Sequence, residues 1–120
     1  MTPAAIEALQ TSSFPIAKLD VVEEVRTMRA SPRPGGRLGK TLVHNPDLRM
    51  VLMVLDRGAR IPRHRSKGSL TIQALDGRVI VALLDSSFDL EPGQILAIDR
   101  DVSHALVAIE ESALLLTIAH

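Results

Sequence analysis

The sequence predicts an all-β protein, either a sandwich or a barrel, and two observations lead to this prediction. From residue 40 onward, short apolar runs alternate with turn-forming residues at near-regular spacing, which is typical of antiparallel sandwiches and barrels. In addition, Asp76 and Gly77 separate two of these runs, as in the two-residue turn of a β-hairpin. The expected strands are 40–44, 48–55, 70–75, 78–84, 94–98, 104–109 and 113–119.

Two of the expected strands, 48–55 and 113–119, are apolar at almost every position. A strand with one solvated face alternates apolar and polar residues, so continuous apolarity indicates that both faces are covered. One cover is the interior of the barrel. The other is either the N-terminal segment or a second copy of the chain, and we expect a homodimer.

The 120 residues are enough for one domain. Residues 30–39 are rich in proline and glycine and predict a connector with little regular structure. The pattern of short apolar runs begins directly after this connector. We therefore expect residues 1–36 to form an arm that is not an independent domain, and residues 37–120 to form the barrel.

The expected arm contains two possible helices. Thr2 and Pro3 are typical of a helix start, and they predict a short helix over 3–9. The valines within 18–29 suit a strand, but the spacing of the apolar residues there suits a helix. We favour the helix, with Asp20 as its N-cap.

The composition argues against several kinds of partner and site. Lysine plus arginine and aspartate plus glutamate number 14 each, and this neutrality argues against a nucleic-acid partner. The absence of cysteine excludes disulfides, thiolate ligands and cysteine nucleophiles. We see no secretory signal and no apolar run of membrane-spanning length. We therefore expect a cytoplasmic protein without a membrane partner.

The stretch from Gly58 to Gly77 resembles the first motif of the cupin superfamily. Gly58 is followed after five residues by His64, the first motif histidine. Ser66 stands where the second histidine belongs, and Leu70 stands where the glutamate belongs. Gly77 closes the motif at the expected distance. The spacing is intact, whereas two of the three metal ligands of this motif are replaced.

A second stretch resembles the second cupin motif. Gly93 is followed after five residues by Asp99 in the proline place, and Asp101 stands in the second glycine place. His104 falls on the motif histidine, and Ala108 falls on the asparagine. The resemblance extends from about Lys40 to His120, about two-thirds of the chain. The resemblance to small, single-domain RmlC-like cupins implies a double-stranded β-helix, or jelly-roll, barrel with a degenerate metal motif.

In cupins, the motif side chains hold a divalent metal inside the barrel. The resemblance therefore implies that His64 and His104 are the remaining ligands for weakly held iron, nickel, zinc or manganese. A third ligand would come from elsewhere, and His44 and His120 are the available histidines. Strand alternation places further residues on the inner face. Those expected to line the pocket are Ser66, Leu70, Ile72 and Leu106.

Two functions remain open at this point. The first is a protein that binds a small, largely apolar or weakly anionic molecule, with the two histidines orienting it; Leu70 in the glutamate place favours this function. The second is a metal-dependent enzyme of the dioxygenase or isomerase type, which the retention of both histidines favours. The basic cluster between Arg57 and Lys67 is a solvated edge, a dimer salt-bridge surface or an anion-binding rim.

Overall fold

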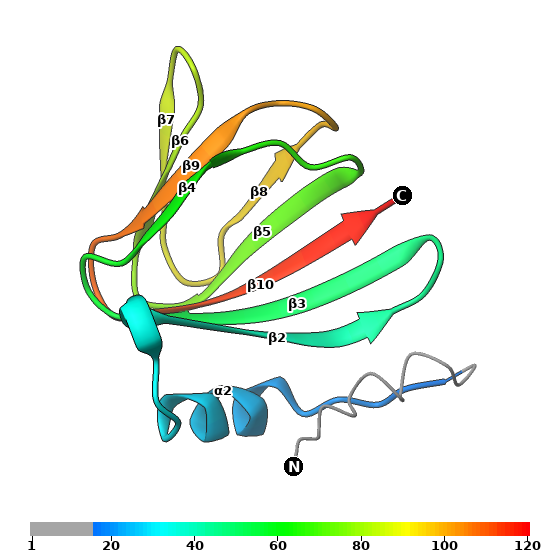
Figure 1. Cartoon of the computed structure of the whole chain (residues 1–120), viewed down its shortest axis with the longest axis vertical. Coiled ribbons are helices and arrows are strands. Elements are labelled where there is room, and N and C mark those ends of the chain that lie inside the picture. The colour runs from blue at the N-terminus through cyan, green and yellow to red at the C-terminus, as the bar shows by residue number, and fades with distance from the viewer. Residues whose placement is uncertain (1–15) are drawn as a thin grey trace.

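The computed structural model describes residues 16–120 and contains two antiparallel sheets, with one helix outside the larger sheet (Figure 1). The larger sheet has the strand order β2-β3-β10-β5-β8, and the smaller has the order β4-β9-β6-β7. The elements are α2 (Val21–Arg29), the 3-10 helix η1 (Pro34–Gly36), β2 (Arg37–His44), β3 (Leu48–Leu55), β4 (Arg60–His64), β5 (Ser69–Asp76), β6 (Val79–Ala82), β7 (Ser87–Leu90), β8 (Ile95–Ile98), β9 (His104–Ala108) and β10 (Ser112–Ala119). The predicted all-β jelly-roll architecture is confirmed, and the helix predicted over 3–9 lies outside the described residues.

Aliphatic side chains fill the space between the two sheets. Leu55, Val79 and Leu114 are completely buried there. Full burial of such a side chain contributes about 1.5–3 kcal/mol, so this layer supplies much of the driving force for folding. Three residues that strand alternation predicts to face inward belong to the same cluster, as expected: Leu70, Ile72 and Leu106.

Helix α2 covers the outer face of the larger sheet (Figure 1). The side chain of Asp20 accepts a hydrogen bond of 3.0 Å from the backbone N–H of Glu23, which confirms the predicted N-cap. Buried Val25 and Met28 pack against outward-facing residues of the sheet, which include Leu52, Val54 and Ala113. The sheet is therefore apolar on both faces because the core covers one face and the arm covers part of the other.

The prediction of a hairpin turn at Asp76 and Gly77 is wrong. These residues connect β5 to β6, and the two strands belong to different sheets. A type I′ turn requires positive φ at both central residues. Gly77 has φ +81°, but Asp76 does not have a positive φ. Among the described non-glycine residues, Asp101 is the one with a positive φ. The turn therefore carries the chain across the barrel instead of folding one strand back on another.

Two short strands, β4 and β7, were not predicted. Each lies at an edge of the smaller sheet and is mostly exposed. No strand was expected between 55 and 70, but this segment contains β4. Edge strands tolerate proline and polar residues because one side of the strand makes no ladder hydrogen bonds. Because of Pro62 and the charged residues beside it, β4 lacks the apolar pattern from which a strand is predicted.

Candidate functional site

His64 and His104 are brought together inside the barrel. They occupy directly opposite positions on the neighbouring strands β4 and β9. Their ring centroids are 4.3 Å apart, and the ring planes meet at 62° in an edge-to-face arrangement. The His104 side chain is buried, whereas His64 is exposed. The pair therefore has one ring set in the protein and one open to solvent.

A β-bulge in β4 gives His64 its inward orientation. Ile61 pairs with Leu106, and His64 pairs with His104. Between these two pairs the chain advances three residues along β4 but two along β9. Ile61 packs against the interior cluster. Strict alternation would then place a residue three positions later on the outer face. The extra residue of the bulge reverses this alternation and returns the imidazole to the inside.

The two imidazoles make equivalent hydrogen bonds to the backbone. The Nδ1 atom of His64 lies 2.9 Å from the carbonyl oxygen of Pro62, and Nδ1 of His104 lies 2.9 Å from that of Val102. A carbonyl oxygen only accepts, so each Nδ1 must carry the proton and donate it. In the neutral rings, the lone pair then lies on Nε2. This is the arrangement in which protein histidines bind metals.

Burial lowers the pKa of His104 below its ordinary value, and the neighbouring imidazole of His64 and the guanidinium of Arg63 act in the same direction. Its hydrogen bond to Val102 acts in the opposite direction but is outweighed. Arg63 also donates to the Ser103 hydroxyl at 3.3 Å, which places this cation directly beside the site. His104 is therefore a neutral imidazole near pH 7.

The donor set is too small for an ordinary protein metal centre. Within residues 16–120, no group of three or more histidine, cysteine, aspartate or glutamate side chains is arranged to hold a metal ion. Catalytic zinc normally has three protein ligands and a water, and structural zinc has four. Two imidazoles fit a metal only if the remaining positions are filled by water or by a bound small molecule.

The other predicted site residues have different surroundings. Leu70, Ile72 and Leu106 are packed in the interior cluster, with exposed fractions of 4%, 1% and 6%. Ser66 lies beyond the end of β4, so strand alternation does not fix the direction of its hydroxyl. Whether these four residues line a binding pocket stays a prediction.

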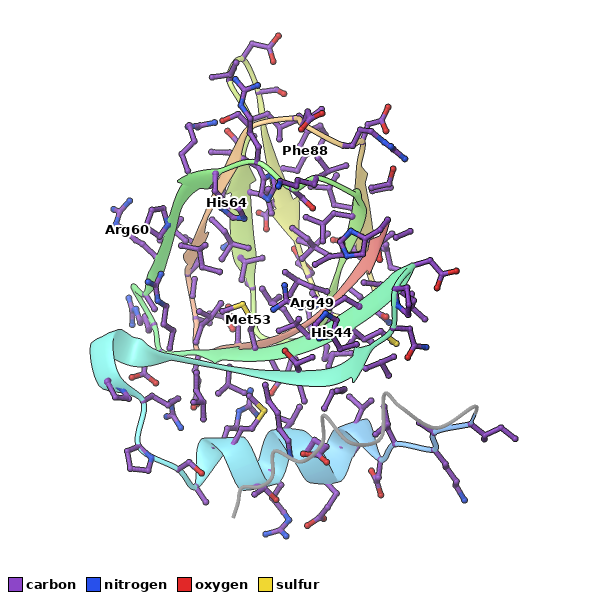
Figure 2. The ribbon with its side chains drawn as sticks, turned by 45° about the vertical axis from the view of Figure 1, so that its right-hand side comes forward. His44, Arg49, Met53, Arg60, His64 and Phe88 are labelled. Atoms are coloured by element: carbon purple, nitrogen blue, oxygen red, sulfur yellow. The ribbon has the colours of Figure 1, made fainter. Side chains whose placement is uncertain are left out.

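Arg49 and His44 face the interior at the same end of the barrel as the histidine pair. Arg49 pairs with Ile118, which packs against the interior cluster, and His44 pairs with Arg49. Figure 2 shows both side chains, with Met53, on the side of β2 and β3 that faces the smaller sheet. Sequence reasoning did not assign Arg49 to the site. The feature that could have indicated a role for Arg49 is that it is the one charged residue in the apolar run 48–55.

The turn positions of the two motifs have the backbone conformation that glycine favours. Gly58, Gly77 and Gly93 have φ values of +84°, +81° and +88°. Asp101, which stands in the second glycine place, has φ +64°. Aspartate is one of the few non-glycine residues that tolerate this conformation. The motif geometry is therefore kept at Asp101 although the glycine itself is replaced.

The comparisons with known proteins agree with this fold. No protein-family model and no curated protein matches the chain. A solved structure of a conserved protein of unknown function from Streptococcus pyogenes is similar at 26% identity, with a TM-score of 0.72 and 90% of each chain covered. An RmlC-like cupin from Shewanella frigidimarina is similar at 24% identity, with a TM-score of 0.67 and coverage of 71% of this chain and 77% of that one.

A cupin superfamily protein from Desulfitobacterium hafniense is similar at 16% identity, with a TM-score of 0.73 and coverage of 88% of this chain and 94% of the other. The chain therefore has the fold of these cupin structures. RmlC-like cupins are among the structures that it resembles. A further observation concerns membranes: α2 is the one α-helix in residues 16–120, and its nine residues are too short to cross a bilayer.

Proposed function

We propose that this cupin binds a small, largely apolar or weakly anionic molecule at the end of the barrel that carries His64 and His104. The observation that carries the proposal is the contact between the two rings, in which each Nδ1–H donates a hydrogen bond to a backbone carbonyl oxygen. This arrangement leaves two Nε2 atoms able to accept hydrogen bonds from a ligand. A cytoplasmic location is part of the same proposal.

The same two Nε2 atoms would hold at most a weak divalent metal ion, such as iron, nickel, zinc or manganese. A bound metal would supply Lewis acidity, and the chain would contribute two oriented imidazoles. The alternative function, a metal-dependent enzyme of the dioxygenase or isomerase type, is favoured by this orientation alone. The shortage of protein ligands makes binding the better-supported function.

Metal content separates these two functions. We expect purified protein to hold less than one equivalent of metal and to lose it on dialysis against a chelator, because two imidazoles give few bonds to the ion. Elemental analysis before and after dialysis measures this directly. Stoichiometric iron, nickel or zinc that survives the chelator would contradict the binding proposal and support the enzyme. Mass spectrometry of small molecules released on denaturation then searches for the natural ligand.

We also propose that the chain forms a homodimer through the part of the larger sheet that α2 leaves uncovered. On β8, Ile95 is 59% exposed and Ala97 is exposed, and both face the same side as Thr71 and Gln73 of β5. We expect light scattering to give twice the chain mass of 13.0 kDa. Ile95→Glu should give monomers, whereas Val22→Glu, at an exposed position of α2, should not. A monomeric wild-type protein would refute the dimer.

A further inference from the structure

We propose that Arg49 binds a carboxylate group of the ligand, so that the site selects small carboxylic acids with an apolar body. This inference rests on the proposed function and adds the chemical class of the ligand to it. It depends on the position of Arg49, on the absence of a partner for its charge, and on the apolar residues that follow Arg49 across the larger sheet.

The register of the sheet places Arg49 on the interior face. One continuous row of paired residues crosses the larger sheet at this level, in the order His44, Arg49, Ile118, Leu70 and Ile98. The last three residues of this row pack in the interior cluster. Residues directly opposite in antiparallel strands point to the same face. Arg49 therefore points toward the smaller sheet, on which the two site histidines lie.

The guanidinium of Arg49 has no carboxylate partner within residues 16–120. The strands contain only two acidic residues, Asp76 and Asp89. Asp76 pairs with Arg29 of α2 at 2.9 Å, and Asp89 accepts a 2.9 Å hydrogen bond from Arg78 at the surface. No described strand thus offers a negative charge to the interior. The charge of Arg49 is left for water or for a ligand.

The chemistry of these side chains defines the ligand. Arginine binds carboxylates through two parallel hydrogen bonds, which makes it selective for planar anions. Ile118 on β10 is directly opposite Arg49 and provides an apolar side chain beside it, and Leu70 follows on β5. Arg49 is exposed, so a ligand can reach its guanidinium from solvent at this end of the barrel. A monocarboxylate with a short apolar chain fits these constraints.

The test uses hexanoate as the probe and hexanamide as its neutral counterpart, with binding followed by NMR titration of the full chain. We expect hexanoate to bind about tenfold or more tightly than hexanamide, because a hydrogen bond to a charged group is worth more than a neutral one. Arg49→Gln should remove this preference, and Arg49→Lys should keep part of it. The control Arg57→Gln, at an exposed position in the β3–β4 connection, should keep it fully.

Three outcomes would overturn the inference: no hexanoate binding to the wild-type protein, equal affinity for the two probes, or an unchanged preference in Arg49→Gln. A parallel Ni²⁺ titration monitors the imidazoles of His64 and His104 independently. If Arg49→Gln keeps the wild-type response to Ni²⁺ but the carboxylate preference was never present, only the ligand class is wrong. If hexanoate binds without any perturbation of either imidazole, the histidine-based proposal fails while the role of Arg49 survives.

Discussion

Gly77→Ala is expected to destabilise the protein by about 2–5 kcal/mol, because two separate costs apply at this turn. The residue has φ +81°, a conformation that costs an L-residue about 1–2 kcal/mol. An added Cβ would also overlap the carbonyl oxygen of Glu111 and the hydroxyl of buried Ser112. Forcing atoms into a packed region costs roughly a further 1–3 kcal/mol. Urea denaturation measures the loss of unfolding free energy.

Gly93→Ala is the matched control for this prediction. Gly93 has φ +88°, but nothing lies within 4 Å of the position that its Cβ would occupy. Only the conformational cost applies, so we expect a loss of about 1–2 kcal/mol. Equal losses in the two variants would show that the crowding at Glu111 and Ser112 is relieved by movement of the chain, and the argument for a tight crossover would fail.

His64→Ala and His104→Ala are each expected to lower the affinity for Ni²⁺ or Zn²⁺ by more than about 100-fold. Loss of a group that only orients a ligand costs about 10–100-fold, and loss of one of two direct ligands should cost more. Isothermal titration calorimetry measures the affinity. His120→Ala is the control, because within residues 16–120 this exposed residue forms no metal-holding group with the two site histidines. We expect both site variants to remain folded, and a large fall in Tm for both would mark the histidines as structural instead.

The same pair predicts how stability depends on pH. The pKa of His104 is lower in the folded protein than its ordinary value of about 6.5, mainly because the ring is buried. The unfolded chain therefore binds a proton at a higher pH than the folded chain does. The contribution of His104 to the free energy of unfolding should be fully present above its ordinary pKa and should be lost as the pH falls below it. His104→Ala should remove this part of the pH dependence in urea denaturation.

The sequence was most informative where an element is buried on both faces or is locally capped. The bounds of β3 were predicted as 48–55, because a run of apolar residues with clear turn signals on both sides admits little else. Helix α2 begins directly after Asp20, since the cap is a local interaction that a short sequence can specify. Such elements depend on neighbours in sequence, so their pattern is visible without a structure.

The errors in the fold arise where distant parts of the chain decide the structure. Asp76 and Gly77 satisfy the local chemistry of a hairpin, but β5 instead pairs with β8 and β10. The hydroxyl of Ser112, far along the chain, accepts a hydrogen bond from the N–H of Arg78 at 3.0 Å and holds this crossover. The edge strands were missed because exposure removes the apolar pattern that identifies buried strands.

The candidate site was predicted in part. The meeting of His64 and His104 followed from the motif spacing, and the 4.3 Å ring contact agrees with it. The position of Arg49 did not follow, because its relation to the histidines depends on the pairing of β3 with β10 and on the packing of one sheet over the other. Spacing within one strand gives no information about which side chains lie across a barrel.

The bulge in β4 has a consequence for variation at this site. Whether residue 64 contacts its partner on β9 depends on the number of residues that follow Ile61, more than on which residues they are. Removal of Pro62 alone would shorten this stretch by one, and the ring of His64 would then point to the outer face of the sheet, away from His104. Deletion of one residue would thus separate the two rings without changing the fold of the barrel. Insertion of almost any amino acid at the same place would bring the rings together again.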